Sequence, residues 1–485
     1  FMSRTQVDRL FGCGRWRPLE RFVLYQSEKR RVIDNARKTG HNEQTLLPET
    51  IHTVNVDFIA CVIRDTLARL WDPASSCPTS STPWLRVRMA TDDLPDAYRG
   101  HPVLHEHMRY SVVAIWVKGQ GWRFTLLWGL AYGLEAAVVA LNRFPLLGVS
   151  ICRRCASSMA AAYFDDELSV EFIQDCRVSQ VGLHTVFQLL GARPQPGKSF
   201  PPGPDRHYLG TSVHLGELSS EFYVKIQPKF STSFKVLHKI DEVLHLGTLS
   251  RDTASKLRGD LTWMFSACAG FAARYAAPLL RRCQVEGAIQ LTPEDRVALQ
   301  CLRSFVVSAR PRCISILGSP KPRVTVYTDA SFERNELRLG WVCFAASFET
   351  FGGTMVVPTE AVEAWKARDQ QIFPGECLAA LVLPLVFPEI FEDQDCLWFV
   401  DNQAAVSSLV KTTSSEADVR EIVHFAALVR DSLGARVWFE WIDSDSNPSE
   451  GLSREGLLCS WTVRQGWHLR EVPFPPQALR EVIRS

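Results

Sequence analysis

The stretch AAYFDDELSV, residues 161–170, constrains the fold more than any other part of this chain. Apolar residues precede and follow Asp165 and Asp166, which is the pattern of two strands joined by a tight turn. Adjacent carboxylates repel each other, and apolar neighbours make both of them harder to ionise. The pair is therefore either an ordinary turn, where aspartate is common, or a turn whose charges are offset by a bound cation.

A second predicted strand also ends in acids, at Asp92 and Asp93 of ATDDLPDAYR. Carboxylates at two strand ends can meet on one sheet edge and hold two divalent cations ~3.5–4 Å apart, as in phosphoryl transfer. Their hard oxygens favour Mg²⁺ over metals that prefer softer ligands. Asp92 and Asp93 compete for the ligand's place, and the motif resemblance given below favours Asp93, which Leu and then Ala-Tyr follow.

Composition sets broad limits on the class of protein. A length of 485 residues allows about two to four domains, and 46% hydrophobic with 22% charged residues is ordinary for a globular chain. The net charge of +1 gives no global field for binding nucleic acid. Residues 1–40 nevertheless hold ten Lys/Arg against four Asp/Glu, which is either a solvated basic face or a phosphate-binding surface.

The cysteines and apolar runs indicate a compartment. Fourteen cysteines without a dense framework favour reduced thiols, so we expect an intracellular protein, cytoplasmic or nuclear, with an organelle left open. Cys152 and Cys155 have no second pair at zinc-site spacing and are interpreted as buried thiols. Since no apolar run reaches about 18 residues without a charge, we expect no membrane span. Phe1 followed by Met2 suggests a fragment boundary.

The predicted elements alternate along the chain. We expect a strand over RRVIDNAR (30–37), a helix over 53–71, and a strand, a turn at Pro95 and a helical segment over 84–103. Residues 124–144 begin as a strand, break near Gly129 and Gly133, and continue as a helix. A Pro/Gly-rich loop over 193–215 closes on a strand and is followed by mostly helical sequence to about 307. After residue 323, strands alternate with helices, one of them interrupted by proline in GECLAALVLPLVF, which favours an α/β domain.

In these motifs the first two-thirds of the chain resembles a reverse transcriptase. DLPDAYRGHPV resembles the first catalytic-strand motif, and YFDD matches the Y-x-D-D turn. The resemblance implies that Asp93, Asp165 and Asp166 bind two Mg²⁺ or Mn²⁺ ions. It places Tyr98 at an aromatic gate that excludes a ribose 2′-OH.

The same resemblance implies contacts to the nucleotide and primer. Tyr132 and Gly133, in GLAYGLEAAV, would lie under the incoming nucleotide and template, with Glu135 a departure from the family pattern. Lys198 would donate a proton or contact phosphate. Arg30, with Arg31 as the alternate, would clamp the triphosphate. HYLGTSVHL resembles a primer grip, and this assigns Tyr208, Leu209 and Gly210.

The C-terminal third resembles ribonuclease H. VYTDAS, PGECLAAL and FVDNQAAV supply Asp329, Glu376 and Asp401, and SDSNPSEGLSR supplies Glu450 where the family usually has aspartate. Four carboxylates in this order imply a second pair of Mg²⁺ or Mn²⁺ ions. The added methylene of Glu450 can move that ligand by about 1 Å, which puts nuclease activity in more doubt than polymerase activity.

The predicted architecture is an α/β and α+β multidomain protein. Fingers and palm cover residues 1–215, a helical thumb or connection 216–308, a linker 309–323, an RNase H-like domain 324–458, and a C-terminal tail 459–485. RRVIDNARKTGHNEQT, NRFP and SNPSEGLSR resemble most closely the reverse transcriptase–RNase H of tyrosine-recombinase (DIRS-type) retroelements.

The predicted function is RNA-directed DNA polymerase with hybrid-cutting RNase H. Its partners would be an RNA template, a DNA primer, RNA–DNA hybrid and dNTPs, with other polyprotein segments or a ribonucleoprotein assembly also possible. The alternative is a domesticated, catalytically silent scaffold in a ribonucleoprotein. For the polymerase we expect Asp93 to approach the YFDD turn, whereas a basic side chain that plugs this cleft in place of ions would reject the polymerase and leave only an inherited shape.

Overall fold

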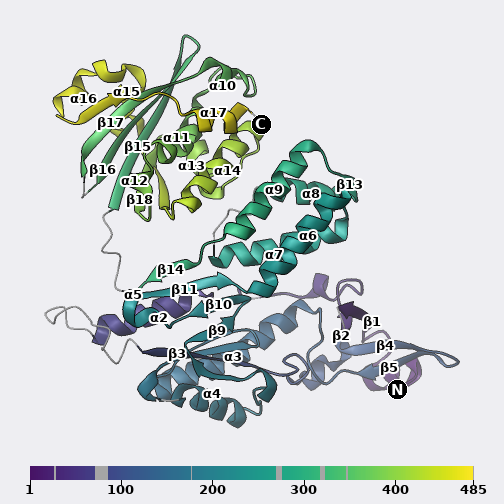
Figure 1. The fold of residues 1–485 in the computed structure, drawn as a ribbon. Coiled ribbons are helices and arrows are strands. Elements are labelled where there is room, and N and C mark those ends of the chain that lie inside the picture. The colour runs from purple at the N-terminus through teal and green to yellow at the C-terminus, as the bar shows by residue number, and fades with distance from the viewer. Residues whose placement is uncertain are drawn as a thin grey trace. The chain divides into compact units, whose positions relative to one another are not determined.

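The computed structural model describes residues 1–26, 29–47, 49–70, 86–175, 177–268, 276–316, 323–345 and 348–483 (Figure 1). Residues 84–85 of a predicted strand, 317–322 of the predicted linker and the last two residues of the predicted tail lie outside these ranges. The chain divides into two compact units, Phe1–Lys225 with Ile314–Ile316, and Ile226–Cys313 with Leu317–Ser485. The finer predicted boundaries, at 215, 308 and 458, stay predictions.

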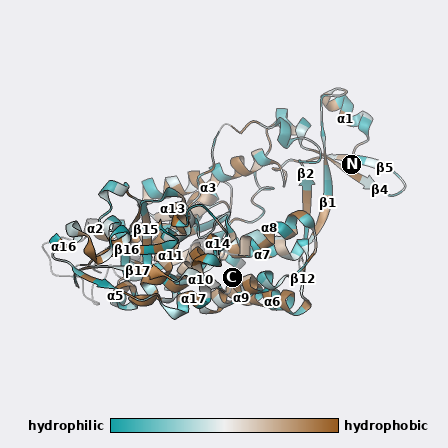
Figure 2. Cartoon of the chain, turned by 90° about the horizontal axis from the view of Figure 1, so that it is seen from above, coloured by the Kyte–Doolittle hydropathy of each residue, from teal (hydrophilic) through white to brown (hydrophobic). Residues whose placement is uncertain are grey.

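The first unit contains a sheet in the order β2-β1-β4-β5. These strands are β1 (Pro18–Gln26), β2 (Lys29–Asn35), β4 (Val112–Val117) and β5 (Gly121–Leu126). The helices α1 (Arg4–Phe11) and α2 (Asp57–Leu70) belong to the same unit. The strand predicted from RRVIDNAR and the helix predicted at 53–71 are therefore confirmed. β1 is rich in hydrophobic residues (Figure 2), and its Phe22, Val23 and Leu24 are exposed.

A second sheet of this unit, in the order β6-β7-β3-β8, carries the acidic turn. Its strands are β3 (Val87–Asp93), β6 (Met159–Tyr163), β7 (Asp166–Phe172) and β8 (Phe200–Gly203). α3 (Glu135–Ala156) and α4 (Val178–Leu189) pack together, and Val149, Leu183 and Phe187 form a buried core with β6. The β6–β7 hairpin and the strand-to-helix change over 124–144 are as predicted.

Several local expectations need correction. The residues after Asp93 form turns and then the 3₁₀ segment His105–Tyr110 instead of an α-helix, and Asp96 has a φ of 48°, which a helix does not contain. Residues 193–215, predicted as a loop closing on one strand, form the 3₁₀ turn η5 (Pro196–Lys198), β8, β9 (Asp205–Tyr208) and β10 (Thr211–His214). Cys152 is buried, but Cys155 is exposed because it lies in the last turn of α3, where the final four residues face solvent.

β9 and β10 join a third sheet, in the order β14-β11-β10-β9, with β11 (Tyr223–Pro228) and β14 (Arg312–Ser315). A four-residue helix, α5 (Leu218–Glu221), precedes β11. Among the described residues, α3 is the one helix with the length and hydropathy of a membrane span. It is nearly half buried by the protein, and the core helix of a soluble protein meets the same test.

After the end of β11, the second unit continues with helices, as predicted for most of residues 216–307. These are α6 (Phe230–Leu246), α7 (Arg251–Cys268), α8 (Ala277–Glu286) and α9 (Pro293–Ser308), with a short β12 (Thr248–Leu249) and β13 (Ile289–Gln290) pair. Buried Ile240, Leu257, Leu299 and Phe305 pack between them. α9 begins at a capping box in which Thr292 and Asp295 satisfy each other's backbone N–H groups.

The rest of this unit is built on a six-stranded mixed sheet in the order β19-β18-β15-β16-β17-β20. Its strands are β15 (Arg323–Glu333), β16 (Glu336–Ala345), β17 (Phe348–Val357), β18 (Asp395–Val400), β19 (Arg436–Trp441) and β20 (His468–Glu471). β15 pairs in parallel with β18 and antiparallel with β16. The chain is thus a mixed α/β multidomain protein, as the predicted fold class requires.

Helices cover this sheet and enclose its core. They are α10 (Thr359–Glu363), α11 (Ile372–Val386), α12 (Pro388–Phe391), α13 (Gln403–Lys411), α14 (Ala417–Ser432), α15 (Glu450–Arg454), α16 (Ser460–Arg464) and α17 (Pro476–Ile483). Figure 1 shows α11, α13 and α14 lying close together beside the strands. The predicted interruption at Pro384 is wrong, because α11 continues through it to Val386. The buried tryptophans Trp341 and Trp398 are the largest members of this core.

Candidate metal centres

The β6–β7 hairpin presents Asp165 in a two-residue turn. Tyr163 pairs with Asp166 at the end of the ladder, so Phe164 and Asp165 form the turn. Phe164 has a φ of 52°, a left-handed conformation that is uncommon for a residue other than glycine. A strained backbone of this kind persists only where the surrounding structure enforces it, and such strain clusters at functional sites.

Asp93 lies directly beside this turn. It is the cross-strand partner of Asp166, and the next backbone N–H, of Leu94, donates to the Asp165 carbonyl at 3.0 Å. Burial raises the pKa of Asp165, and the charge of Asp93 raises it further. The fold therefore places Asp93, Asp165 and Asp166 at one sheet end, although among the described residues this trio is not a group whose ligand oxygens all lie within 4.8 Å of one another.

Lys198 makes a direct contact with Asp93. Its Nζ lies 2.9 and 2.8 Å from the two carboxylate oxygens, and the Lys198 charge also lowers the pKa of Asp165. A cation on Asp93 would have to displace this ammonium group. The lysine side chain is 51% exposed, so packing does not prevent it from moving away.

Two aromatic rings and a tight turn lie next to the acids. The Tyr98 and Tyr132 ring centroids are 4.9 Å apart, and the charge of Asp165 adds to burial in raising the pKa of Tyr98. Gly133 has a φ of 92°, and a Cβ there would lie 2.4 Å from the Asp34 carbonyl oxygen. Asn42 bonds to the Gly133 carbonyl and accepts from the Glu135 N–H, so the departure at Glu135 begins a capped helix.

Arg99 and Asp34 support this corner, and the sequence did not identify them. The buried Asp34 carboxylate accepts from Arg99 Nη2 at 2.6 Å and from Arg21 Nε at 2.8 Å. The Arg99 guanidinium also lies 4.9 Å from the Tyr132 ring centroid. Since Asp34 belongs to β2, these bonds fix that strand against the Tyr132–Gly133 turn.

The remaining predicted contacts occupy two hairpins. Arg30 and Arg31 are exposed on β2, with Arg30 5.7 Å from the Tyr25 ring centroid. Leu209 and Gly210, with φ of 45° and 74°, form the tight β9–β10 turn. Tyr208 and Leu209 are buried, and burial raises the pKa of Tyr208.

The second unit brings three distant acids together. Asp329 on β15, Glu376 on α11 and Asp401 after β18 each offer an oxygen, and these oxygens lie within 4.8 Å of one another. Asn402 caps α13 through bonds from the Ala404 and Ala405 N–H groups, which fixes Asp401 at the carboxyl end of β18. The donor set of carboxylate oxygens fits Mg²⁺ or Mn²⁺.

Hydrogen bonds hold this cluster in place. The Ala330 N–H donates to Glu376 at 2.8 Å, Ser444 donates to Asp401 at 2.7 Å, and Ser453 donates to Asp329. Burial raises the pKa of Asp329 to about 7. Burial also raises the pKa of Glu376 well above its usual range, and the charges of Asp329 and Asp401 raise it further. Three clustered acids, two of which have a raised pKa, are a candidate site for a divalent cation.

Glu450 does not join this group of three. Its carboxylate lies 2.7 Å from Arg454 Nη2 on the same short helix, α15. The Arg454 charge in turn lowers the pKa of Asp329, so the arginine acts on both acids. The sequence reasoning missed Ser444, Ser453 and Arg454, although all three lie within or next to SDSNPSEGLSR.

Comparisons with known proteins give a distant likeness of fold. No family model and no curated protein match the sequence. A foamy viral protease-reverse transcriptase in complex with dsDNA is 11% identical over 88% of this chain and 78% of its own, with a TM-score of 0.45. The same viral protein with an RNA/DNA hybrid gives the same identity and TM-score, and this chain spans half of its length. At this level of similarity, function has to be inferred from the side chains of this chain.

Proposed function

We propose that this chain is an RNA-directed DNA polymerase with an RNase H-like nuclease domain. The observation that carries the proposal is the position of Asp93 next to Asp165 and Asp166 at one sheet end, beside Tyr98. Paired carboxylates at that position suit two-metal phosphoryl transfer. The fingers, palm and thumb arrangement and the DIRS-type subgroup are parts of this proposal that rest on the sequence motifs.

Each polymerase residue has a proposed role. Asp93, Asp165 and Asp166 would hold two Mg²⁺ or Mn²⁺ ions, which would lower the pKa of the primer 3′-OH and stabilise the pyrophosphate. Tyr98 would restrict the sugar of the dNTP, and Tyr132 with Gly133 would form the surface under the base. Lys198, once displaced from Asp93, would donate a proton or contact phosphate, and Arg30 or Arg31 would bind the triphosphate. Tyr208, Leu209 and Gly210 would hold the primer.

The nuclease proposal rests on Asp329, Glu376 and Asp401. Their clustered oxygens would hold two cations that direct water at the RNA strand of a hybrid. Glu450 was predicted as the fourth ligand, and it could serve only after leaving Arg454.

A silent ribonucleoprotein scaffold is the second candidate, and two contacts favour it. Lys198 neutralises Asp93 where a cation would lie, and Arg454 holds Glu450 away from the three-acid cluster. A scaffold needs such internal pairing, because without metal its acids repel. The seven carboxylates of the two proposed sites count against the scaffold, because a scaffold has no use for them.

Primer extension on poly(rA)/oligo(dT) with Mg²⁺ tests the polymerase. We expect wild type to incorporate dTTP and Asp165→Asn to lose at least about 100-fold in rate, since a metal ligand is removed. Equal incorporation by the two proteins would reject the polymerase, and no incorporation by wild type would favour the scaffold.

Cleavage of a labelled RNA–DNA hybrid tests the nuclease. We expect Asp401→Asn to abolish cleavage and Glu450→Gln to retain it within about tenfold, because Glu450 is already paired outside the cluster. A hybrid left intact by wild type after long incubation with Mg²⁺ or Mn²⁺ would contradict the nuclease assignment.

A further inference from the structure

The second acid of the ATDD stretch, Asp92, has its own set of partners. Successive side chains of a strand point to opposite faces of the sheet, so Asp92 and Asp93 diverge. Asp92 is 3% exposed and accepts from Gln180 Nε2 at 3.1 Å, from His184 Nε2 at 2.9 Å and from Ser199 Oγ. Gln180 and His184 are one turn apart on α4, so hydrogen bonds from both side chains connect this helix to the end of β3.

The segment 195–199 holds both acids at once. Ser199 bonds to Asp92, while its neighbour Lys198 bonds to Asp93 on the other side of the strand. A backbone bond from Gln195 N to Asp93 O, 2.9 Å long, is the third link. Since Lys198 lies between Gln195 and Ser199, these two anchors fix where its side chain begins.

Asp92 is buried opposite a second buried acid, so its hydrogen bonds matter more than they would at the surface. Its cross-strand partner is Glu167, which is fully buried and has no hydrogen-bond partner on either oxygen among the described residues. Burying a carboxylate is costly unless several donors satisfy it, so the loss of one donor should loosen the cluster. The hydrogen bonds of Asp92 explain this cluster without a ligand. Because the cluster lies directly behind Asp93 and Lys198, it can support the position of these two residues.

We propose that Asp92, His184 and Ser199 are positioning residues that fix the segment carrying Lys198 and so set the place from which its ammonium group reaches the acidic turn. The inference deepens the proposed function and rests on it, because a polymerase needs this lysine at a fixed place near the phosphates. A displacement of about 1 Å at such a site is enough to lower the rate strongly.

Acylation of lysine amines, followed by mass spectrometry of the full chain, tests the position of Lys198 directly. We expect Ser199→Ala and Asp92→Asn to raise the labelling rate of Lys198 about threefold, which corresponds to losing a partly exposed ion pair. The exposed Lys118 should label at the wild-type rate in both variants, which shows that the reagent acts equally on each protein, and an unchanged thermal unfolding curve shows that the unit is folded. Ser199→Thr keeps the hydroxyl and should restore the wild-type rate for Lys198.

Ser169→Ala is the matched control. Ser169 is also a serine of this sheet, fully buried on β7, but its hydroxyl has no hydrogen-bond partner among the described residues. Unchanged Lys198 labelling in Ser199→Ala, Asp92→Asn and His184→Gln, with Lys118 also unchanged, would overturn the proposal. A rise in Ser169→Ala equal to that in Ser199→Ala would overturn it too, because any packing change would then suffice.

Primer extension separates this inference from the proposed function. In an active enzyme, Ser199→Ala should lower kcat about tenfold while KM for dTTP stays within about twofold. If wild type incorporates nothing but Lys198 labelling still responds to Ser199→Ala, the polymerase proposal fails and the positioning role stands. If wild type is active and neither labelling nor kcat responds, the positioning role fails alone.

Discussion

Gly133 is a residue near the acids where two segments of backbone approach each other closely. Its φ of 92° suits glycine, and a Cβ would lie 2.4 Å from the Asp34 carbonyl oxygen. Gly119 has a similar φ of 80° with nothing within 4 Å of the added carbon. A substitution at Gly119 therefore tests the cost of the backbone conformation alone, whereas one at Gly133 adds the cost of the steric contact.

We expect Gly133→Ala to lower the free energy of unfolding by about 3 kcal/mol or more, and Gly119→Ala by about 1 kcal/mol. Urea denaturation of both variants measures the difference. Equal losses would mean that the corner of Asp34 and Tyr132 is looser than its contacts indicate.

At the residue scale, the sequence predicted the acids better than their partners. Asp93 was preferred to Asp92 from its neighbours, and the structure places Asp93 beside the turn and Asp92 behind it. The Asp92 partners could have been suspected from Gln180 and His184, two polar residues one turn apart on α4. The pairing of Glu450 with Arg454 could not, because (i, i+4) pairs are common and do not reveal which partner an acid prefers.

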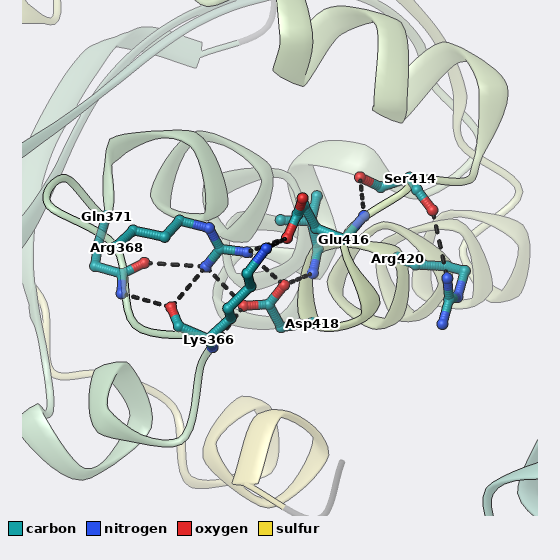
Figure 3. A network of polar contacts seen from close by, with 8 residues as sticks. Lys366, Arg368, Gln371, Ser414, Glu416, Asp418 and Arg420 are labelled. Atoms are coloured by element: carbon teal, nitrogen blue, oxygen red, sulfur yellow. Dashed lines mark hydrogen bonds and ion pairs between the residues drawn. The ribbon is translucent and has the colours of Figure 1, made fainter.

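At the element scale, a polar network joins the segment before α11 to the start of α14 (Figure 3). Arg368 donates to both Asp418 oxygens at 2.7 Å, and Asp418 also accepts from the Lys366 and Val419 N–H groups. Lys366 pairs with Glu416 at 2.7 Å. Since α11 carries Glu376, this network sets where that helix begins relative to the acid cluster.

Arg368 should matter far more than Lys366. The Arg368 side chain is 16% exposed and makes a two-pronged bond, so Arg368→Ala should cost about 2–3 kcal/mol in the free energy of unfolding. Lys366→Ala, with a side chain 64% exposed, should cost less than about 1 kcal/mol. A double-mutant cycle of Arg368 with Asp418 measures the coupling, and a coupling near zero would contradict the network's role.

Elements were predictable where pattern and length agreed. The β6–β7 hairpin and the strands β15, β18 and β19 followed from apolar runs bounded by turn residues, whereas β20 lies within the segment predicted as a tail. Pro384 misled the prediction for α11, because a helix buried along most of its length gains enough from packing to keep a proline near its end. The short strands β8, β9 and β10 were harder to predict, because their sequence is rich in proline and glycine. In such a sequence, pairing with distant strands decides the conformation.

At the scale of the whole molecule, the acid clusters should make stability depend on pH and metal. The pKa of Asp329 is about 7 in the folded protein, above the value near 4 expected when unfolded. Between these values the folded state binds more protons, so the free energy of unfolding should fall as pH rises from about 4 to 7 in metal-free protein.

Thermal unfolding with and without Mg²⁺ checks this prediction. We expect Tm to be higher at pH 5 than at pH 7.5 without metal, and Mg²⁺ to raise Tm more at pH 7.5, where the carboxylates are ionised. Asp329→Asn should reduce both effects. A Tm that rises with pH in wild type and is indifferent to Mg²⁺ would contradict the picture of a strained acid cluster.

Manganese binding followed by electron paramagnetic resonance tests the claim that both carboxylate clusters bind divalent cations. We expect saturable Mn²⁺ binding in wild type, partial loss in Asp165→Asn and in Asp401→Asn, and near-complete loss in the protein carrying both substitutions. Equal Mn²⁺ binding by wild type and the doubly substituted protein, or none by wild type, would contradict it.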